Sequence, residues 1–135
     1  MSLLYEDLTA KILEACFEVS NELGAGFLEA VYQNALLIAL REKCMSAEPQ
    51  AAMNVLFRGQ PVGQYFADIL VESKIILELK AVSALSSVHQ AQVINYLKAT
   101  GLEVGLLVNF GNPKLEFRRL HRKLTLPAIE RSKEK

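Results

Sequence analysis

The chain of 135 residues has no tryptophan, only two cysteines and two histidines, and no excess of charge, since 15 Lys and Arg residues balance 15 Asp and Glu residues. Cys16 and Cys44 form no CxxC pair and have no neighbouring histidine, which argues against a zinc or redox site and predicts two buried, reduced thiols. Zero net charge gives no long-range attraction to polyanions, so any binding of nucleic acid needs a local cluster of cations.

Long apolar runs are also missing from the chain. None approaches the roughly 18 residues that a membrane span requires, and the first residues show no basic segment followed by a continuous apolar one. We therefore expect a cytoplasmic protein that does not use a membrane. A chain of 135 residues is typical of one domain, and we predict a single domain over residues 1–125 followed by a polar tail over residues 126–135.

Apolar periodicity and turn residues predict an α/β order of elements. In chain order they are helices over 4–23 and 28–43, a strand over 50–58 with a turn over 58–61, strands over 65–71 and 75–80, a helix from Ser86-Ser87 to Thr100, and a strand over 103–110. The first three strands form an antiparallel meander. The last strand follows a helix of crossover length, so it is predicted to lie parallel to the strand over 75–80.

The segment YFADILVESKIILELK, residues 65–80, carries charged side chains inside two apolar strands. Alternation along a strand places Glu78 and Lys80 on one face. If residues 72–74 form the loop, Val71 pairs with Ile75 and Asp68 lies opposite Glu78 on that same face. A two-residue turn would instead place Asp68 and Glu78 on opposite faces.

Paired carboxylates at this position favour a bound cation. Directly opposed residues have Cβ atoms about 4.5–5.5 Å apart, and two like charges about 4 Å apart repel by about 4 kcal/mol at an effective dielectric of 20. Mg²⁺ prefers oxygen ligands and usually keeps waters beside one or two carboxylates, and Lys80 would orient an attacking water. The alternative is that Asp68 and Glu78 lie at strand ends with Lys80 as an ion-pair partner.

Three further groups of side chains are candidates, each with a structural alternative. Glu29 and Tyr32 share a helix face, although an acid in a first turn also complements the helix dipole and Tyr32 fits an ordinary core. His89, Gln92 and Tyr96 lie on one stripe of a helix bordered by Asn95, which equally suits a buried hydrogen-bonding cluster. Basic residues crowd the segment 114–123, including Arg118 and Arg119, as they also would in a solvated edge strand and tail.

The order of these motifs resembles the GxxExxY proteins of the PD-(D/E)XK nuclease superfamily. The resemblance covers about residues 5–120 and rests on Gly26-x-x-Glu29-x-x-Tyr32, on Asp68, on Glu78-Leu79-Lys80, and on His89-x-x-Gln92-x-x-Asn95-Tyr96. It implies an α/β/α sandwich with a restriction-endonuclease-like core. Ala67 stands where the superfamily motif has proline, at a position that ligates nothing.

The resemblance also implies roles for individual residues. Asp68 and Glu78 match the metal-binding acids, Lys80 matches the catalytic lysine, and Glu29 matches the acid of the first helix that often completes the metal site. Gln92 and Tyr96 are similar to the Q-x-x-x-Y motif of RecB-type nucleases.

The function implied is a Mg²⁺-dependent nuclease, with Mn²⁺ as a substitute ion, acting on nucleic acid and most readily DNA. His89, Asn95, Arg118 and Arg119 are candidates for substrate contacts, and a homodimer would cut both strands of a duplex. Fold does not dictate function, so two alternatives stay open. One is a catalytically silent module that binds nucleic acid or protein, and the other is a hydrolase of different phosphoesters.

Overall fold

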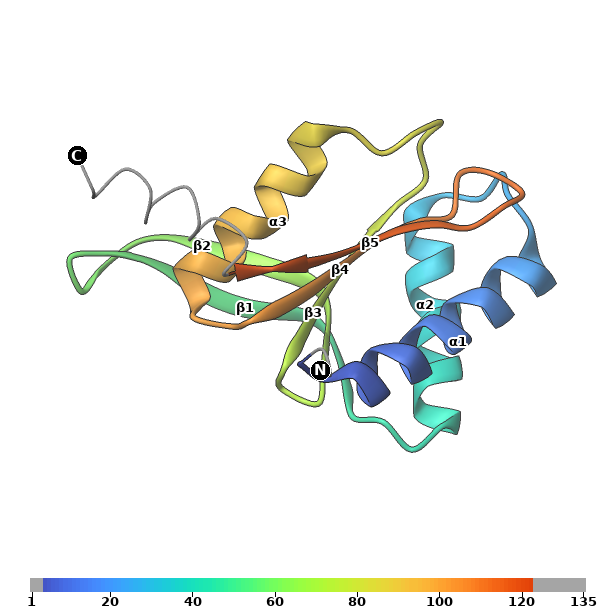
Figure 1. The fold of residues 1–135 in the computed structure, drawn as a ribbon, viewed down its shortest axis with the longest axis horizontal. Coiled ribbons are helices and arrows are strands. Elements are labelled where there is room, and N and C mark those ends of the chain that lie inside the picture. The colour runs from blue at the N-terminus through green and yellow to red at the C-terminus, as the bar shows by residue number, and fades with distance from the viewer. Residues whose placement is uncertain (1–3, 123–135) are drawn as a thin grey trace.

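The computed structural model describes residues 4–122 and contains three helices and five strands within them (Figure 1). The elements are α1 (Glu6–Leu23), α2 (Glu29–Glu42), β1 (Ala47–Phe57), β2 (Gln60–Val71), β3 (Ile75–Lys80), α3 (Ser87–Thr100), β4 (Val104–Asn109) and β5 (Glu116–His121). The predicted tail over 126–135 lies outside the described residues.

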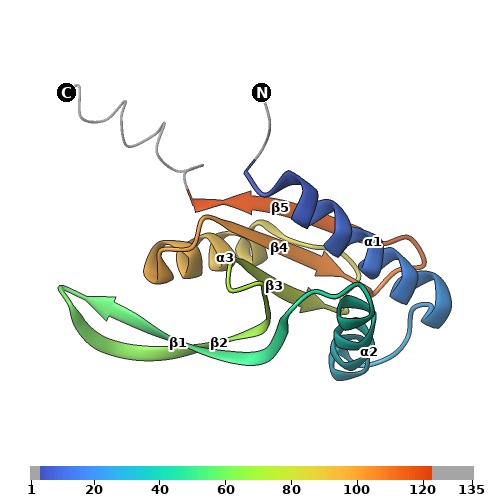
Figure 2. The same cartoon turned by 90° about the horizontal axis from the view of Figure 1, so that it is seen from below.

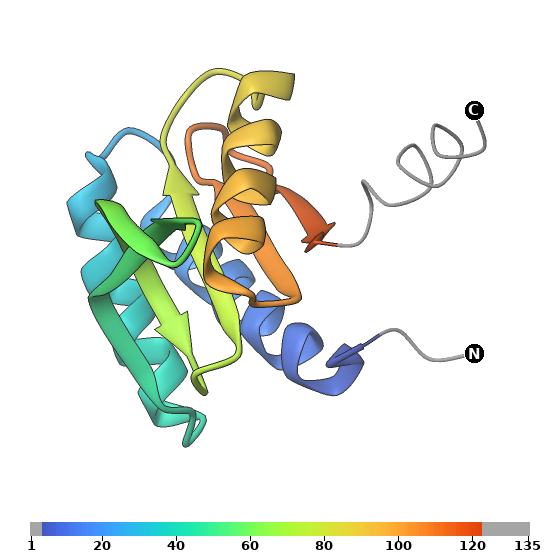
Figure 3. The same ribbon diagram turned by 90° about the vertical axis from the view of Figure 1, so that its left-hand side faces the viewer.

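The five strands form one mixed sheet in the order β1-β2-β3-β4-β5. Neighbouring strands are antiparallel except β3 and β4, which are parallel and joined through α3. Helices α1 and α2 pack on one face over Ile75, Leu77 and Leu79, while α3 packs on the other over Ile76 and Leu107. Figures 2 and 3 show the two helical layers on opposite sides of the sheet. The predicted α/β/α sandwich, with its meander and crossover, is confirmed.

The turn between β2 and β3 gives the register that the three-residue loop predicts. Val71 pairs with Ile75, and Glu72 and Ser73 both have positive φ angles of 54° and 55°. Lys74 donates its N–H to the carbonyl of Val71 at 2.9 Å, which closes the turn. The charged residues of β2 and β3 therefore approach each other on one side of the sheet.

The first hairpin is longer than predicted. β1 begins at Ala47 instead of residue 50, and β2 begins at Gln60 instead of residue 65. The turn consists of Arg58 and Gly59 alone, whose positive φ angles of 52° and 78° fit a tight two-residue hairpin turn. Pro61 lies inside β2 near the tip, where a missing N–H is tolerated.

Two smaller expectations have different outcomes. Ser86 caps α3, and Gly101 ends it in the left-handed region at φ 81°, as the sequence predicts. Cys16 is buried, but Cys44 is exposed and has a φ of 65°, so the expectation of two buried thiols is wrong for Cys44. It follows α2, where the chain reverses towards β1 and the helical pattern no longer applies.

Among residues 4–122, no helix is both long and apolar enough to cross a membrane.

Candidate active site

Asp68 and Glu78 come together where the β2 and β3 ladder ends. The last pair in register is Ile69 with Leu77, and the two acids follow it. Asp68 Oδ2 accepts a hydrogen bond from the N–H of Leu79 at 2.8 Å, and Glu78 Oε2 accepts one from the N–H of Asp68 at 3.3 Å. Each carboxylate is therefore held by the backbone of the opposite strand, so the two acids form one unit.

Burial raises the pKa of both carboxyl groups. The pKa of Glu78 rises to about 7, chiefly because the side chain is desolvated and secondly because the charge of Asp68 is near. The pKa of Asp68 is also raised by desolvation, against the N–H of Leu79 and the charge of Lys80, which lower it. Lys80 is half-buried at the end of β3 and favours ionisation of both acids. Its charge lowers both pKa values but does not cancel the effect of desolvation, so both pKa values stay raised.

Tyr65 is a member of the site that the sequence does not indicate. Its hydroxyl donates a hydrogen bond to Glu78 Oε2, and its ring stacks on Tyr96 with centroids 3.5 Å apart. A hydrogen bond joins Tyr96 to Gln92. A chain of contacts thus runs from Gln92 through Tyr96 and Tyr65 to Glu78, so the predicted Tyr96 lies one side chain away from Glu78 and Gln92 lies two away.

The side-chain amide of a buried asparagine holds the loop between β3 and α3 by hydrogen bonds. Asn109 is fully buried, and its side chain accepts from the N–H of Val82 and donates to the carbonyl of Val82, both at 2.9 Å. It also donates to Glu116 at 3.1 Å, and Glu116 in turn accepts from the N–H of Leu85 at 3.2 Å. These bonds set the path of the chain directly after Lys80.

Glu29 stands apart from the paired acids. It is exposed in the first turn of α2. Within residues 4–122, no three His, Cys, Asp or Glu side chains gather in a group suited to a metal ion. Tyr32 of the same motif is fully buried and donates its hydroxyl to the carbonyl of Gly24 at 2.6 Å. Tyr32 is therefore a core residue, which is the structural alternative considered for it, and its hydroxyl also holds the loop before α2.

The candidate substrate residues divide between two faces. His89 is used in capping, since its Nδ1 accepts from the N–H of Ser86 at 3.1 Å, whereas Asn95 is exposed on α3. Arg118 pairs with Leu107, which pairs with Glu78, so Arg118 lies in the same cross-strand row as the acids. The side chain of Arg119 contacts the carbonyl of Leu4 beside α1. The two arginines are neighbours on β5 and therefore lie on opposite faces of the sheet.

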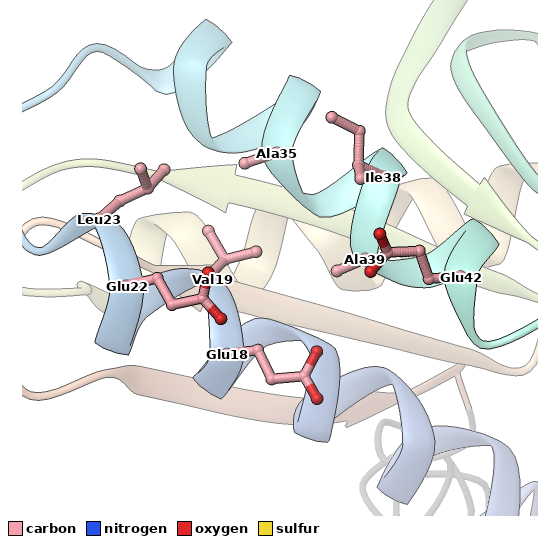
Figure 4. Close-up of a pocket in the computed structure, with 8 residues that line it drawn as sticks. All are labelled: Glu18, Val19, Glu22, Leu23, Ala35, Ile38, Ala39 and Glu42. Carbon is pink, nitrogen blue, oxygen red and sulfur yellow. The ribbon is translucent and has the colours of Figure 1, made fainter.

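A groove between α1 and α2 lies away from the paired acids. Figure 4 shows the residues that line it, namely Glu18, Val19, Glu22, Leu23, Ala35, Ile38, Ala39 and Glu42. Its charged lining residues are all glutamates, and none of the predicted site residues lines it. A polyphosphate would be repelled there, so this groove is not the candidate active site.

Comparison with known proteins fits this geometry. The family model of the PD-(D/E)XK nuclease superfamily matches residues 6–120. The chain belongs to the PD-(D/E)XK nuclease superfamily. Its fold is similar to the crystal structure of SSO0001, with a TM-score of 0.51 and 19% sequence identity over 96% of this chain. The chain spans 66% of the length of that protein. A search of curated proteins gives no match.

The raised pKa of Glu78 predicts that stability depends on pH. The pKa is about 7 in the folded chain against an ordinary value of 4.5, so the folded state keeps a proton that the unfolded chain releases between these values. The free energy of unfolding without metal should therefore fall by on the order of 3 kcal/mol as pH rises from about 4.5 to about 7.

Urea denaturation in a chelator, at several pH values, measures this change. Glu78→Gln should remove most of the slope, whereas Glu48→Gln, at an exposed residue, should keep it. Identical slopes in the wild type and Glu78→Gln would show that Glu78 does not hold the proton.

Proposed function

We propose that this protein is a Mg²⁺-dependent nuclease that hydrolyses phosphodiester bonds in DNA. The observation that carries the proposal is the pair formed by half-buried Asp68 and buried Glu78, which share backbone hydrogen bonds and have Lys80 beside them. Membership of a nuclease superfamily over residues 6–120 supports a nucleic-acid substrate.

The paired acids fit a hard divalent cation. Both offer carboxylate oxygens. Desolvation and, secondly, the charge of Asp68 raise the pKa of Glu78, and a bound cation opposes both effects because it favours the ionised carboxylates. Mg²⁺ commonly uses one or two carboxylates and completes its shell with waters and phosphate oxygens. We assign Asp68 and Glu78 as the ligands and Glu29 as a third acid, which would have to approach them from the start of α2.

When bound, the ion lowers the pKa of a water and stabilises charge on the reacting phosphate. Lys80 orients the attacking water and adds positive charge where negative charge develops. Tyr65 donates a hydrogen bond to Oε2 of Glu78 and fixes that oxygen, so the other carboxylate oxygen of Glu78 is available to the ion. Gln92 and Tyr96 position the scissile phosphate, and Asn95, His89 and Arg118 contact the flanking nucleic acid.

A duplex has two strands, and a single site of this size cuts one of them at a time. We therefore propose that the active form is a homodimer with one site for each strand.

The test combines metal titration with cleavage. Calorimetry with Mg²⁺ and with Mn²⁺ should give binding to the wild type and none to Glu78→Gln, because one of only two paired carboxylates is lost. Supercoiled plasmid should be cut only when metal is present, and an RNA of matched sequence should be cut more slowly. Metal binding that is absent even with DNA present would overturn the proposal and favour a silent module that binds nucleic acid or protein.

A further inference from the structure

The outer half of the β1 and β2 hairpin extends beyond helices α1 and α2 (Figures 1 and 2). Four large apolar side chains in it are about half exposed or more, namely Leu56 at 50%, Phe57 at 58%, Val62 at 63% and Phe66 at 49%. Arg58 is the only charged residue between 52 and 66, and its guanidinium lies over the ring of Phe57, 4.8 Å from the centroid. The hairpin thus presents an apolar surface with almost no charge.

β1 is also an edge of the sheet. It stands first in the strand order, and within residues 4–122 no strand pairs with its outer side. Residues 51–55 pair regularly with β2, up to an irregularity between Val55 and Leu56. Native edge strands are usually protected by lysine, proline, an inward charge or a β-bulge, and residues 51–55, before the irregularity, contain none of these. This part of β1 is therefore suited to accept another strand.

We propose that β1 pairs antiparallel with β1 of a second copy of this chain, so that two sheets become one of ten strands. A nucleic acid is disfavoured as the occupant because binding phosphates requires several cations, and this surface has one arginine. A second copy needs no charge complementarity, since a two-fold contact brings the same apolar patch together with itself. The small side chain of Ala52, which pairs with Phe66, leaves that ring accessible to the partner.

The role of this dimer rests on the proposed nuclease function. The pairing of the two β1 strands would orient both active sites. The two-fold axis of an antiparallel strand pair is perpendicular to the sheet, so α3 of each copy lies on the same side. Asp68 lies on the second strand from the shared edge, so three strand spacings, about 14 Å, separate the two Asp68-bearing strands. Five spacings, about 24 Å, separate the two Glu78-bearing strands. Two sites so placed face one duplex from one side.

Sedimentation of the full chain at about 100 μM, a concentration at which even weak pairs with a micromolar Kd assemble, tests the interface without metal or substrate. The wild type should have twice the 15.0 kDa mass of one chain. Leu56→Lys and Phe66→Lys should each sediment as single chains, because a lysine is then buried without a partner. Val88→Lys is the matched control: Val88 is 71% exposed on α3, away from the hairpin, so this variant should remain a dimer.

A monomeric wild type, or hairpin variants that remain dimers, would overturn the interface. Circular dichroism shows whether each variant is folded, and agreement between two separate substitutions guards against a local effect of either. The variants also distinguish this inference from the nuclease proposal. Monomeric variants should still nick one strand of a plasmid at the rate of the wild type but should no longer produce linear DNA. Loss of nicking in all proteins alike would refute the nuclease while leaving the interface supported.

Discussion

Asp68→Asn is expected to lower the rate of metal-dependent DNA cleavage by at least about 100-fold, since a metal ligand contributes several kcal/mol of transition-state stabilisation and each 1.36 kcal/mol is tenfold. The fold should survive, because the asparagine carbonyl can still accept the hydrogen bond that Asp68 accepts from Leu79. The change also removes a charge that repels Glu78. The free energy of unfolding at about pH 8 should therefore stay the same or rise.

Initial rates of plasmid nicking, with urea denaturation of the same samples, measure both parts of this prediction. Asp7→Asn is the matched control, since Asp7 is an exposed acid in the first turn of α1. It should cut at the rate of the wild type. Cleavage by Asp68→Asn at the rate of the wild type would mean that the activity comes from elsewhere or from a contaminant.

Gly111→Ala is expected to be strongly destabilising. A Cβ atom at Gly111 would lie 2.1 Å from the carbonyl oxygen of Val82 and 2.6 Å from its nitrogen, so backbone must move. Val82 lies in the loop between β3 and α3, which Asn109 holds by two hydrogen bonds. These two bonds would be strained or lost. Overpacking typically costs 1–3 kcal/mol and each lost hydrogen bond about 1 kcal/mol, so a loss of about 3–5 kcal/mol is expected.

Thermal unfolding measures this loss, and a Tm lower by about 10–20 °C is expected for a domain of this size. Gly63→Ala is the matched control, because no atom lies within 4 Å of the position that its Cβ would occupy. Its Tm should change little. Equal Tm values for the two variants would show that the loop accommodates a side chain and that the approach to Val82 does not constrain it. Because this loop follows Lys80, folded Gly111→Ala should also cut DNA more slowly.

The meeting of Asp68 and Glu78 is predictable because two simple rules combine. Alternation along a strand assigns the face, and the length of the turn assigns the register, so one correct turn brings the two acids together. The crossover rule predicts the parallel pairing of β3 with β4 equally well. Both inferences need only local chain geometry.

Tyr65 is missed for a physical reason. Strict alternation places residue 65 on the face opposite Asp68, yet Tyr65 and Ala67 pack on the α3 side while Ile69 and Val71 pack on the α1 and α2 side. The alternation breaks next to Asp68, where Gln50 on the neighbouring strand has a φ of 48°. An asymmetry of this kind depends on contacts between strands and has no signature in spacing.

Arg118 and Arg119 show the opposite lesson. They look like one basic cluster when counted along the chain, but neighbours on a strand point to opposite faces. Arg118 lies in the row of Glu78 and Leu107, and Arg119 lies beside α1. The alternation rule that pairs the acids also separates these arginines, because residues 116–121 form a strand at the edge of the sheet.

The single parallel pairing in the sheet has a consequence for how the protein folds. Short turns join β1, β2 and β3, so pairing these strands closes only short loops. Pairing β3 with β4 closes a longer loop, because the whole of α3 lies between these two strands. Contacts distant in sequence form slowly because loop closure costs entropy before it is repaid. Asp68 and Glu78 should therefore meet early in folding. Tyr96 should reach Tyr65 late, so the acidic pair exists before the helix that completes it arrives.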